Sequence, residues 1–250
     1  MIKIAVNGAA GRMGNRILAL AEIEKEFEIA GAFDENKNFS KLSAAALQKK
    51  GSGTLIDFSS PAGAKAALEM ALEAQWNLVV GTTGLDEKTT VLLREASKKI
   101  AVVVSSNMSV GVNVLLELAA LLAHKLPKDF DIEITEAHHR HKKDAPSGTA
   151  LMLAKAIAES KKWDLKKALK YRAEGKSDQE RSGEEIGMQV IRAGEIIGNH
   201  TVLFSGPAET IEITHRAQSR DTFARGALLA AQFVSKKANG FYTMKEVLAK

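Results

Sequence analysis

The chain has 250 residues, 45% of them hydrophobic and 26% charged, so it can form a core for one large domain or two modest ones. It contains no cysteine, which excludes disulfides, thiolate nucleophiles and cysteine-ligated metals. The net charge of +5 suits an enzyme with anionic ligands as well as a nucleic-acid-binding protein, although an aromatic fraction of 5% argues against base stacking.

Strand-like and helix-like segments alternate through the first part of the chain. Short apolar runs predict strands, and apolar residues spaced three and four positions apart predict helices. Strands are expected at 2–6, 27–33, 54–58, 77–80 and 101–104, and helices at 12–21, 61–74 and 87–99. This alternation predicts an α/β fold with a parallel sheet covered by helices on both faces.

The pattern changes near residue 110. The segments expected next are a helix at 110–125, a strand at 130–137, a helix at 149–160 and a polar loop with at most short elements at 161–187. Strand-like runs at 188–192, 200–204 and 210–215 follow, before a long helix at 222–236. The central part is therefore predicted to be α+β, built on a mostly antiparallel or mixed sheet.

Three glycines separate the first predicted strand from the first predicted helix, in the spacing Gly8-x-x-Gly11-x-x-Gly14. Glycines in such a turn let the backbone approach a pyrophosphate, which rests on the helix N-terminus. The spacing departs from the common Gly-x-Gly-x-x-Gly because residue 10 is alanine. Its place between strand and helix still favours a Rossmann-type dinucleotide site over a plain turn.

Asp34 and Glu35 follow the second predicted strand, about 20 residues after the turn, where an acid that recognises ribose is expected. A carboxylate there can accept from the ribose 2′-hydroxyl and repel a 2′-phosphate. We therefore predict that NADH is used at least as well as NADPH. Lys37 and Arg12 are close enough in sequence to accommodate NADPH too, and one of the two acids could simply be solvated.

Two further loops follow predicted strands of the same sheet. Residues 81–84 read Gly-Thr-Thr-Gly and residues 105–108 read Ser-Ser-Asn-Met. Ligands of open α/β sheets bind beyond the carboxyl ends of the strands, so both loops are expected to face the cofactor. Each is also compatible with a plain turn.

Six consecutive residues, 138–143, carry imidazole, guanidinium or ammonium groups. An apolar strand and an amphipathic helix fix this run at both ends, and a fixed positive field predicts an anionic partner. His138 or His139 could supply a proton near neutral pH. The clustered histidines also suggest a metal, but Glu136 is the one acid with suitable spacing and the cations would repel a divalent ion, so no metal site is predicted.

The helix after the basic run has its own anion-binding features. Ser147 is expected to cap it, with Gly148 and Thr149 in its first turn. The free N–H groups and the helix dipole can hold a carboxylate there, with added charge from Lys142. His124, His200 and His215 stand apart from this run and are expected to be structural.

These motifs resemble those of the dihydrodipicolinate reductases, also called 4-hydroxy-tetrahydrodipicolinate reductases. The specific match is the stretch 136–150, and the glycine turn at 8–14 agrees with it. Other segments that resemble the family are 81–84, 107–113, 198–202 and 215–220. The matches run through nearly the whole chain in the expected order.

The resemblance implies two domains. Residues 1–109 with 219–250 would bind the dinucleotide, and residues 110–218 would bind the substrate and form a homotetramer through their sheets. The implied reaction reduces 4-hydroxy-tetrahydrodipicolinate, a small dicarboxylate, with NADH or NADPH in diaminopimelate and lysine biosynthesis. No apolar segment is long enough for a signal peptide or a membrane span, so a cytoplasmic location is expected.

The resemblance also implies site residues, to which the arguments above add Glu35 and Ser147. His138 would donate the proton, with Lys142 beside it. The substrate carboxylates would be held by His139, Lys142, Ser147, Gly148 and Thr149. The cofactor would be bound by Gly8, Ala9, Ala10, Gly11, Arg12, Met13, Asp34, Glu35, Gly81, Thr82, Thr83, Ser105, Ser106, Asn107 and Met108.

Two other interpretations stay open from the residues alone. A Rossmann reductase of a different anionic carbonyl or imine would need the same two sites. A redox-sensing module could instead use a bound nicotinamide nucleotide to control nucleic-acid binding, with the basic run as a phosphate patch. Against that second interpretation, the sequence has no helix-turn-helix and no aromatic-basic surface.

Overall fold

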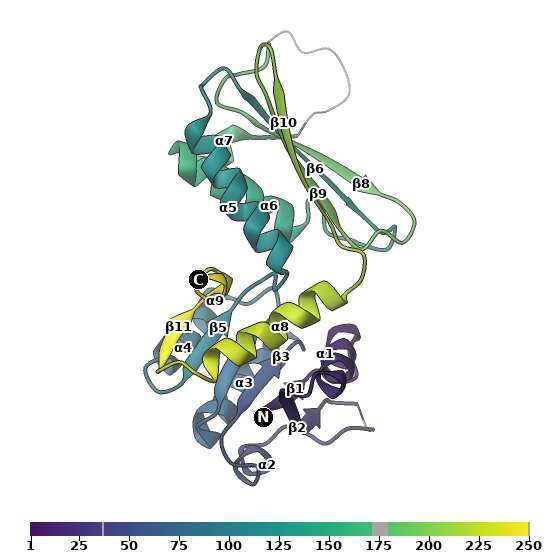
Figure 1. Ribbon diagram of the computed structural model, residues 1–250, viewed down its shortest axis with the longest axis vertical. Coiled ribbons are helices and arrows are strands. Elements are labelled where there is room, and N and C mark those ends of the chain that lie inside the picture. Colours follow the sequence, from purple (N-terminus) through teal and green to yellow (C-terminus); the bar gives the residue numbers. More distant parts are fainter. Residues whose placement is uncertain (37, 172–179, 250) are drawn as a thin grey trace. The chain divides into compact units, whose positions relative to one another are not determined.

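The computed structural model describes residues 1–36, 38–171 and 180–249, and the chain divides into two compact units (Figure 1). Unit 1 comprises Met1–Val110 and Arg220–Lys250, and unit 2 comprises Gly111–Ser219. The cofactor role predicted for one part and the substrate and tetramer role predicted for the other stay predictions. Lys37 lies outside the described residues. Within them, no helix is long and apolar enough to cross a membrane.

Unit 1 is built on a six-stranded sheet, sheet A, in the order β11-β5-β4-β3-β1-β2, and every neighbouring pair is parallel. Its strands are β1 (Ile2–Asn7), β2 (Phe27–Phe33), β3 (Thr54–Asp57), β4 (Asn77–Val80), β5 (Ala101–Val104) and β11 (Gly240–Tyr242). The parallel α/β arrangement and its first five strands are confirmed. The short sixth strand, β11, was not predicted.

Helices cover both faces of sheet A. The helices of unit 1 are α1 (Arg12–Ile23), α2 (Ala44–Gln48), α3 (Pro61–Ala74), α4 (Glu87–Ala96), α8 (Asp221–Val234) and α9 (Met244–Leu248). Side chains from α1, α8 and α9 pack with Ile4 and Ile56 on one face, and those from α2, α3 and α4 pack with Ala5 and Leu55 on the other. Strands buried on both faces read as continuous apolar runs, which is why the sequence pattern located them.

Unit 2 is built on sheet B, in the order β10-β9-β6-β8-β7. Its strands are β6 (Asp131–His138), β7 (Leu169–Tyr171), β8 (Ile186–Arg192), β9 (Asn199–Ser205) and β10 (Thr210–Arg216). Strand β6 pairs antiparallel with β9 and parallel with β8, so the predicted mixed sheet is confirmed. Within the predicted loop at 161–187, the described residues form α7 (Leu165–Ala168), β7 and the start of β8.

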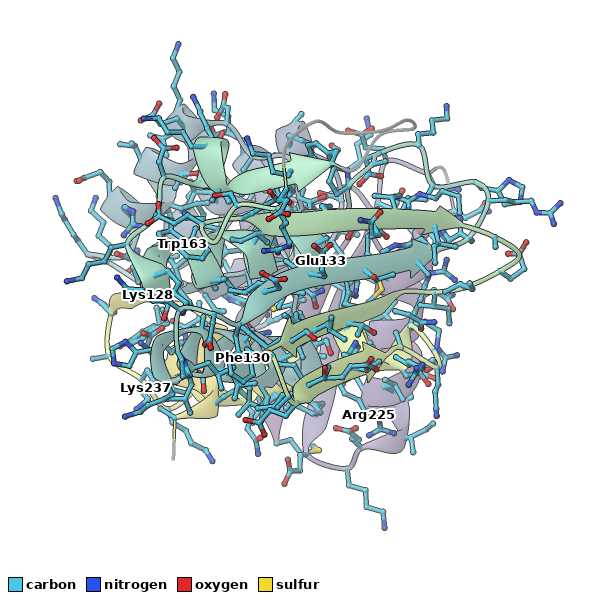
Figure 2. The ribbon with its side chains drawn as sticks, turned by 90° about the horizontal axis from the view of Figure 1, so that it is seen from above. Lys128, Phe130, Glu133, Trp163, Arg225 and Lys237 are labelled. Atoms are coloured by element: carbon cyan, nitrogen blue, oxygen red, sulfur yellow. The ribbon has the colours of Figure 1, made fainter. Side chains whose placement is uncertain are left out.

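One face of sheet B is covered by α5 (Val110–Lys125) and α6 (Gly148–Lys161). Leu115 of α5 and Leu153 of α6 share a buried apolar cluster with Ile134 and Val202 of the sheet. Figure 2 looks onto sheet B, with Glu133 labelled on β6. Alternation along β6 therefore separates an inner face, packed on helices, from an outer face that carries Glu133.

A buried aspartate ties three segments together at the carboxyl edge of sheet A. Asp57, the last residue of β3, is fully buried. Its carboxylate accepts hydrogen bonds from Asn7 Nδ2 at 2.7 Å and from Ser59 Oγ and Thr82 Oγ1, both at 2.6 Å. Burial raises the pKa of Asp57, and these hydrogen bonds oppose the rise. The carboxylate thus joins the segments that follow β3 and β4 to the end of β1.

Replacing Asp57 should separate its role as an acceptor from its charge. Asp57→Ala removes an acceptor from the buried side chains of Asn7 and Thr82 and from the exposed Ser59, and each buried donor is expected to cost roughly 1–3 kcal/mol in the free energy of unfolding. Asp57→Asn keeps the shape and one acceptor, and the two hydroxyl groups can reorient, so its loss should be clearly smaller. Urea unfolding followed by circular dichroism measures both variants. Equal stability of the two would contradict the network described above.

Candidate functional site

A groove of about 730 Å³ opens in unit 1 beyond the carboxyl ends of β1, β2 and β3. Strand β1 lies between β2 and β3 in sheet A. The chain therefore passes from β1 to a neighbour on one side, β2, and then crosses to the other side of β1 to form β3. Open α/β sheets bind their ligands at such a point. Five of the residues predicted for the cofactor line the groove: Gly8, Ala10, Gly11, Asp34 and Glu35.

The glycine turn brings the first strand and the first helix unusually close. Gly8 has a φ of +83°, and a Cβ on it would overlap the carbonyl of Phe58. A Cβ on Gly14 would overlap the carbonyl of Gly8 itself. Neither position tolerates a side chain without movement of the backbone, so the turn forms the close cradle that a pyrophosphate requires.

The N-terminus of α1 is suited to an anion. Gly11 occupies its N-cap position and makes no side-chain capping bond, whereas Ser60 caps α3 through its hydroxyl. No capping side chain therefore accepts a hydrogen bond from the N–H groups of the first turn, at Arg12 and Met13. Together with the glycine cradle, this arrangement fits the phosphates of a dinucleotide.

The predicted ribose-binding acids lie on the groove. Asp34 Oδ2 accepts from the N–H of Ala10 at 2.9 Å, and Oδ1 accepts from the N–H of Asn36 at 2.9 Å. These two bonds fix the carboxylate against the glycine turn. Glu35 also lines the groove but is exposed. The geometry therefore favours Asp34 as the acid with a defined orientation.

The other predicted cofactor loops follow the next strands of the same sheet. Gly81, Thr82 and Thr83 follow β4, and the Thr82 hydroxyl donates to Asp57. Ser105, which begins the loop after β5, donates its N–H to the carbonyl of Val80. Met108 differs from the rest, because its side chain is 1% exposed and belongs to the core. A contact from Met108 would have to come from its backbone.

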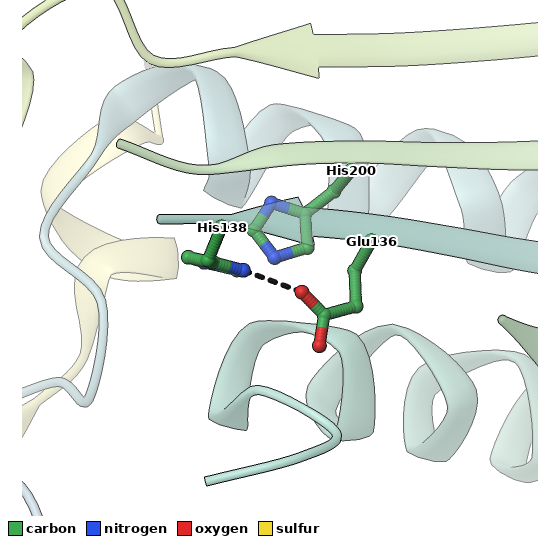
Figure 3. Close-up of side chains that lie close together, drawn as sticks. All are labelled: Glu136, His138 and His200. Carbon is green, nitrogen blue, oxygen red and sulfur yellow. Dashed lines mark hydrogen bonds and ion pairs between the residues drawn. The ribbon is translucent and has the colours of Figure 1, made fainter. Parts of the chain in front are cut away.

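In unit 2, the strand register gathers four polar residues on the inner face of sheet B. His138 lies opposite Arg192 of β8, and Glu136 lies opposite His200 of β9. His138 Nδ1 is hydrogen-bonded to Glu136 Oε2, and the rings of His138 and His200 meet edge to face at 5.1 Å (Figure 3). Glu136 and His138 share this face because side chains two positions apart in a strand point the same way.

Glu136 is fully buried and surrounded by donors. Arg192 donates to both of its oxygens, at 2.8 and 2.9 Å, and the N–H of Ser147 donates to Oε1 at 3.0 Å. Burial acts to raise the pKa of Glu136, but the bonds from Arg192, His138 and Ser147 outweigh it and lower the pKa. Glu136 is therefore ionised at neutral pH.

The histidines next to Glu136 are neutral by contrast. Burial lowers the pKa of His138, and Glu136 opposes this effect while Lys142 and Arg192 add to it. Burial lowers the pKa of His200 to about 3. Because His138 uses Nδ1 toward Glu136, its Nε2 is the nitrogen left for exchange with a ligand.

The predicted carboxylate site follows at the start of α6. Ser147 caps the helix as predicted, since its Oγ accepts from the N–H of Ala150 at 3.2 Å, and it also lies 3.1 Å from His200 Nε2. Space around Gly148 is open, because a Cβ there would meet no atom within 4 Å. Lys142 Nζ pairs with Asp144 at 2.9 Å. His139 is half-buried, and its Nδ1 has no partner among the described residues.

Sequence reasoning missed the parts played by Asp57, Glu136 and Arg192, and it treated Glu136 only as a potential metal ligand. The structural role expected for His200 agrees with its burial and with its hydrogen bond to Ser147. Glu136, His138 and His200 do offer donor atoms within 4.8 Å of one another. However, Arg192 occupies both oxygens of Glu136, and Ser147 lies on His200 Nε2, so a metal could bind only after these contacts break. The absence of a metal site stays a prediction.

A second cavity, of about 1050 Å³, lies in unit 2 near the start of β6. Its lining includes Lys161, Trp163 and Arg181, and Arg181 pairs with Asp131 at 2.7 Å. The residues predicted for catalysis or substrate binding do not line it. Cavity size alone would thus have pointed away from the buried Glu136 cluster.

Comparison with known proteins identifies the family. Models of the N-terminal and C-terminal parts of dihydrodipicolinate reductase match residues 2–108 and 111–248. A 4-hydroxy-tetrahydrodipicolinate reductase of Pseudoalteromonas translucida is 44% identical, over 98% of this chain and 97% of its own length. One from Nitrosomonas eutropha is 40% identical, over 99% and 98%.

Solved structures agree on the fold. A dipicolinate-bound dihydrodipicolinate reductase from Paenisporosarcina sp. TG-14 has a TM-score of 0.80 at 23% identity, covering 99% of this chain and 100% of that one. An engineered D-amino acid dehydrogenase bound to NADP+ has a TM-score of 0.56 at 13% identity, covering 99% and 96%. The WlbA dehydrogenase of Thermus thermophilus, bound to NAD and UDP-GlcNAcA, has the same TM-score and identity, covering 99% and 91%. Because family models match both parts and relatives above 40% identity span nearly the whole chain, this protein belongs to the dihydrodipicolinate reductase family.

Proposed function

We propose that this protein is a 4-hydroxy-tetrahydrodipicolinate reductase, which uses hydride from NADH or NADPH to form tetrahydrodipicolinate for diaminopimelate and lysine biosynthesis. Family membership supports this activity. The observation that carries the proposal is the buried Glu136–His138 pair, bonded to the capped N-terminus of α6. That arrangement offers a proton carrier beside a site for carboxylates.

Unit 1 holds the nicotinamide nucleotide in this proposal. The turn at Gly8 and the uncapped first turn of α1 bind the pyrophosphate, and Asp34 accepts from a ribose hydroxyl. The loops that begin at Gly81 and Ser105 flank the remainder of the nucleotide. Residues 1–109 with 219–250 form this cofactor domain, and residues 110–218 form the substrate domain.

Unit 2 binds the dicarboxylate and supplies the proton. The N–H groups of Gly148 and Thr149 and the charge of Lys142 hold the carboxylates, with His139 at the same site. Lys142 then exchanges the carboxylate of Asp144 for one of the substrate. The 4-hydroxyl group leaves the substrate as water, hydride adds to the unsaturated ring that remains, and His138 gives its proton to the electron-rich ring carbon next to the reduced position. General acid assistance of this kind is worth about 10²–10⁴-fold.

The assembly and location follow the family resemblance. A homotetramer would form through the outer face of sheet B, where Glu133, Thr135, Thr201 and Leu203 are only half-buried and Ile191 is 46% exposed (Figure 2). We place the enzyme in the cytoplasm. The nucleic-acid-binding alternative is not favoured, because the family models account for both units of the chain.

Oxidation of NADH and NADPH, each followed by its loss of absorbance, tests the proposed reaction. The unstable substrate is generated in place from pyruvate and aspartate semialdehyde by the preceding synthase. Oxidation should require both the synthase and this protein. If the protein binds NADH yet oxidises neither nucleotide, the dinucleotide site stands and the proposed substrate is wrong.

His138→Gln should lower kcat by about 10²–10⁴-fold, because glutamine cannot carry the proton. The affinity for NADH should not change, since His138 is not among the cofactor residues. The matched control is His124→Gln, an exposed histidine on α5 outside both sites, which should keep normal turnover. Stopped-flow turnover and NADH fluorescence titration measure the two quantities. Near-normal kcat in His138→Gln would remove this residue from the acid role.

Asp34→Asn should shift the cofactor preference toward NADPH. Removing one charge near a 2′-phosphate relieves about 1 kcal/mol of repulsion, which is roughly a fivefold rise in the NADPH-to-NADH ratio of kcat/KM. Glu35→Gln removes the same charge from the exposed neighbour and should change the ratio less. Steady-state kinetics with both nucleotides compare the variants. A larger shift from Glu35→Gln would assign the discriminating role to Glu35.

A further inference from the structure

Glu136 joins two parts of the proposed substrate site that lie apart in the sequence. Its Oε2 holds His138 Nδ1, and its Oε1 holds the N–H of Ser147, the cap of α6. We infer that Glu136 is a positioning residue: it fixes His138 in the Nδ1–H tautomer, so that Nε2 exchanges the proton, and it ties that nitrogen to the carboxylate-binding turn. This inference rests on the proposed function.

The direction of the Glu136–His138 hydrogen bond follows from the other donors. Glu136 Oε1 accepts from the N–H groups of Ser147 and Arg192, and Oε2 accepts from a second N–H of Arg192. A protonated Glu136 would place its hydrogen among these donors. The ionised carboxylate has no such conflict, so His138 Nδ1 is the donor and Nε2 carries a lone pair in the resting protein.

The groups that face His138 keep Nε2 unprotonated until an anion arrives. Glu136 on β6 is the one acid among the strongest electrostatic influences on His138, and Arg192 on β8 bonds to both of its oxygens. Asp144, in the loop after β6, pairs with Lys142 at 2.9 Å. Lys142, from the loop after β6, adds a positive charge, and His200 on β9 is neutral. A bound dicarboxylate supplies the missing negative charge. Binding should therefore draw a proton from solvent onto Nε2.

Glu136→Gln reverses the polarity of this hydrogen bond. The glutamine oxygen can still accept from Ser147 and from one N–H of Arg192, which directs the amide N–H groups toward His138 Nδ1, while the second N–H of Arg192 loses its acceptor. Nδ1 must then accept, so the proton of neutral His138 moves to Nε2. If His138 became doubly protonated in this variant, its Nδ1–H would face the amide N–H of the glutamine, and two donors would then oppose each other. Turnover should fall by about 10²-fold or more, as for loss of a general acid, while NADH affinity stays unchanged.

A merely structural role of Glu136 predicts something different. Leu153→Ala removes buried side-chain volume from α6 and lowers the melting temperature without touching the carboxylate. If Glu136 only stabilises the fold, Glu136→Gln and Leu153→Ala should behave alike at equal loss of stability. If it positions the proton, Leu153→Ala should retain the wild-type tautomer of His138 and most of its turnover.

Ring nitrogen NMR of ¹⁵N-histidine-labelled protein, with the His138 signals assigned from His138→Gln, tests the inference directly. The probe is dipicolinate, a stable pyridine dicarboxylate. Wild type and Leu153→Ala should show Nδ1–H without the probe and both nitrogens protonated with it. Glu136→Gln should show Nε2–H and gain no second proton. An Nε2–H tautomer in the wild-type protein would overturn the inference. It would also be overturned if Glu136→Gln kept both the wild-type tautomer of His138 and the wild-type turnover.

The two levels of the proposal can fail separately. If Glu136→Gln does not fold, the wild-type tautomer and its change on adding dipicolinate still decide the inference. If wild type oxidises neither NADH nor NADPH with the synthase-generated substrate, the proposed function fails and the catalytic role of Glu136 fails with it. Normal wild-type turnover together with the wrong tautomer overturns the positioning role alone.

Discussion

A carboxylate removed from water must be surrounded by hydrogen-bond donors, and this constraint organises both units. In unit 1, Asp57 gathers donors from the end of β1 and from the segments after β3 and β4. In unit 2, Glu136 gathers donors from β6, from β8 and from the cap of α6. Segments that connect strands to helices generally expose polar backbone and bury few apolar atoms. A buried anion at the strand end therefore supplies the order that apolar packing cannot.

The two carboxylates differ in what surrounds them, and this difference separates their roles. Asp57 has amide and hydroxyl donors, which do not cancel the cost of burying a charge, so its pKa is raised. Glu136 has the guanidinium of Arg192, which holds the negative charge in place, so its pKa is lowered. Asp57 thus acts on geometry alone. Glu136 remains charged and acts on the protonation of His138 as well.

Local patterns were sufficient to predict most elements and the Ser147 cap. Five strands of sheet A follow from continuous apolar runs, because both faces of that sheet are buried, and the α8 helix follows from the spacing of its apolar residues. Strand β11 has three residues, too few for any period, and its place depends on pairing with β5. The Glu136–Arg192 bond spans 56 positions and depends on the parallel register of β6 and β8. No single-sequence pattern encodes that register, so the donors around Glu136 were not predictable.

The basic run at 138–143 shows how a charge pattern can mislead about where the charge acts. Only His138 of this run is buried, because the end of β6 turns its side chain inward. Lys142 is already paired with Asp144, and His141 lies 3.7 Å from Glu195, so the run is not a uniform patch for a polyanion. The strongest electrostatic effect on His138 comes from Glu136, which lies outside the run and is paired with Arg192 of β8. The charge that acts at the buried histidine is therefore set by strand pairing, and the cations beside it in the sequence do not reveal it.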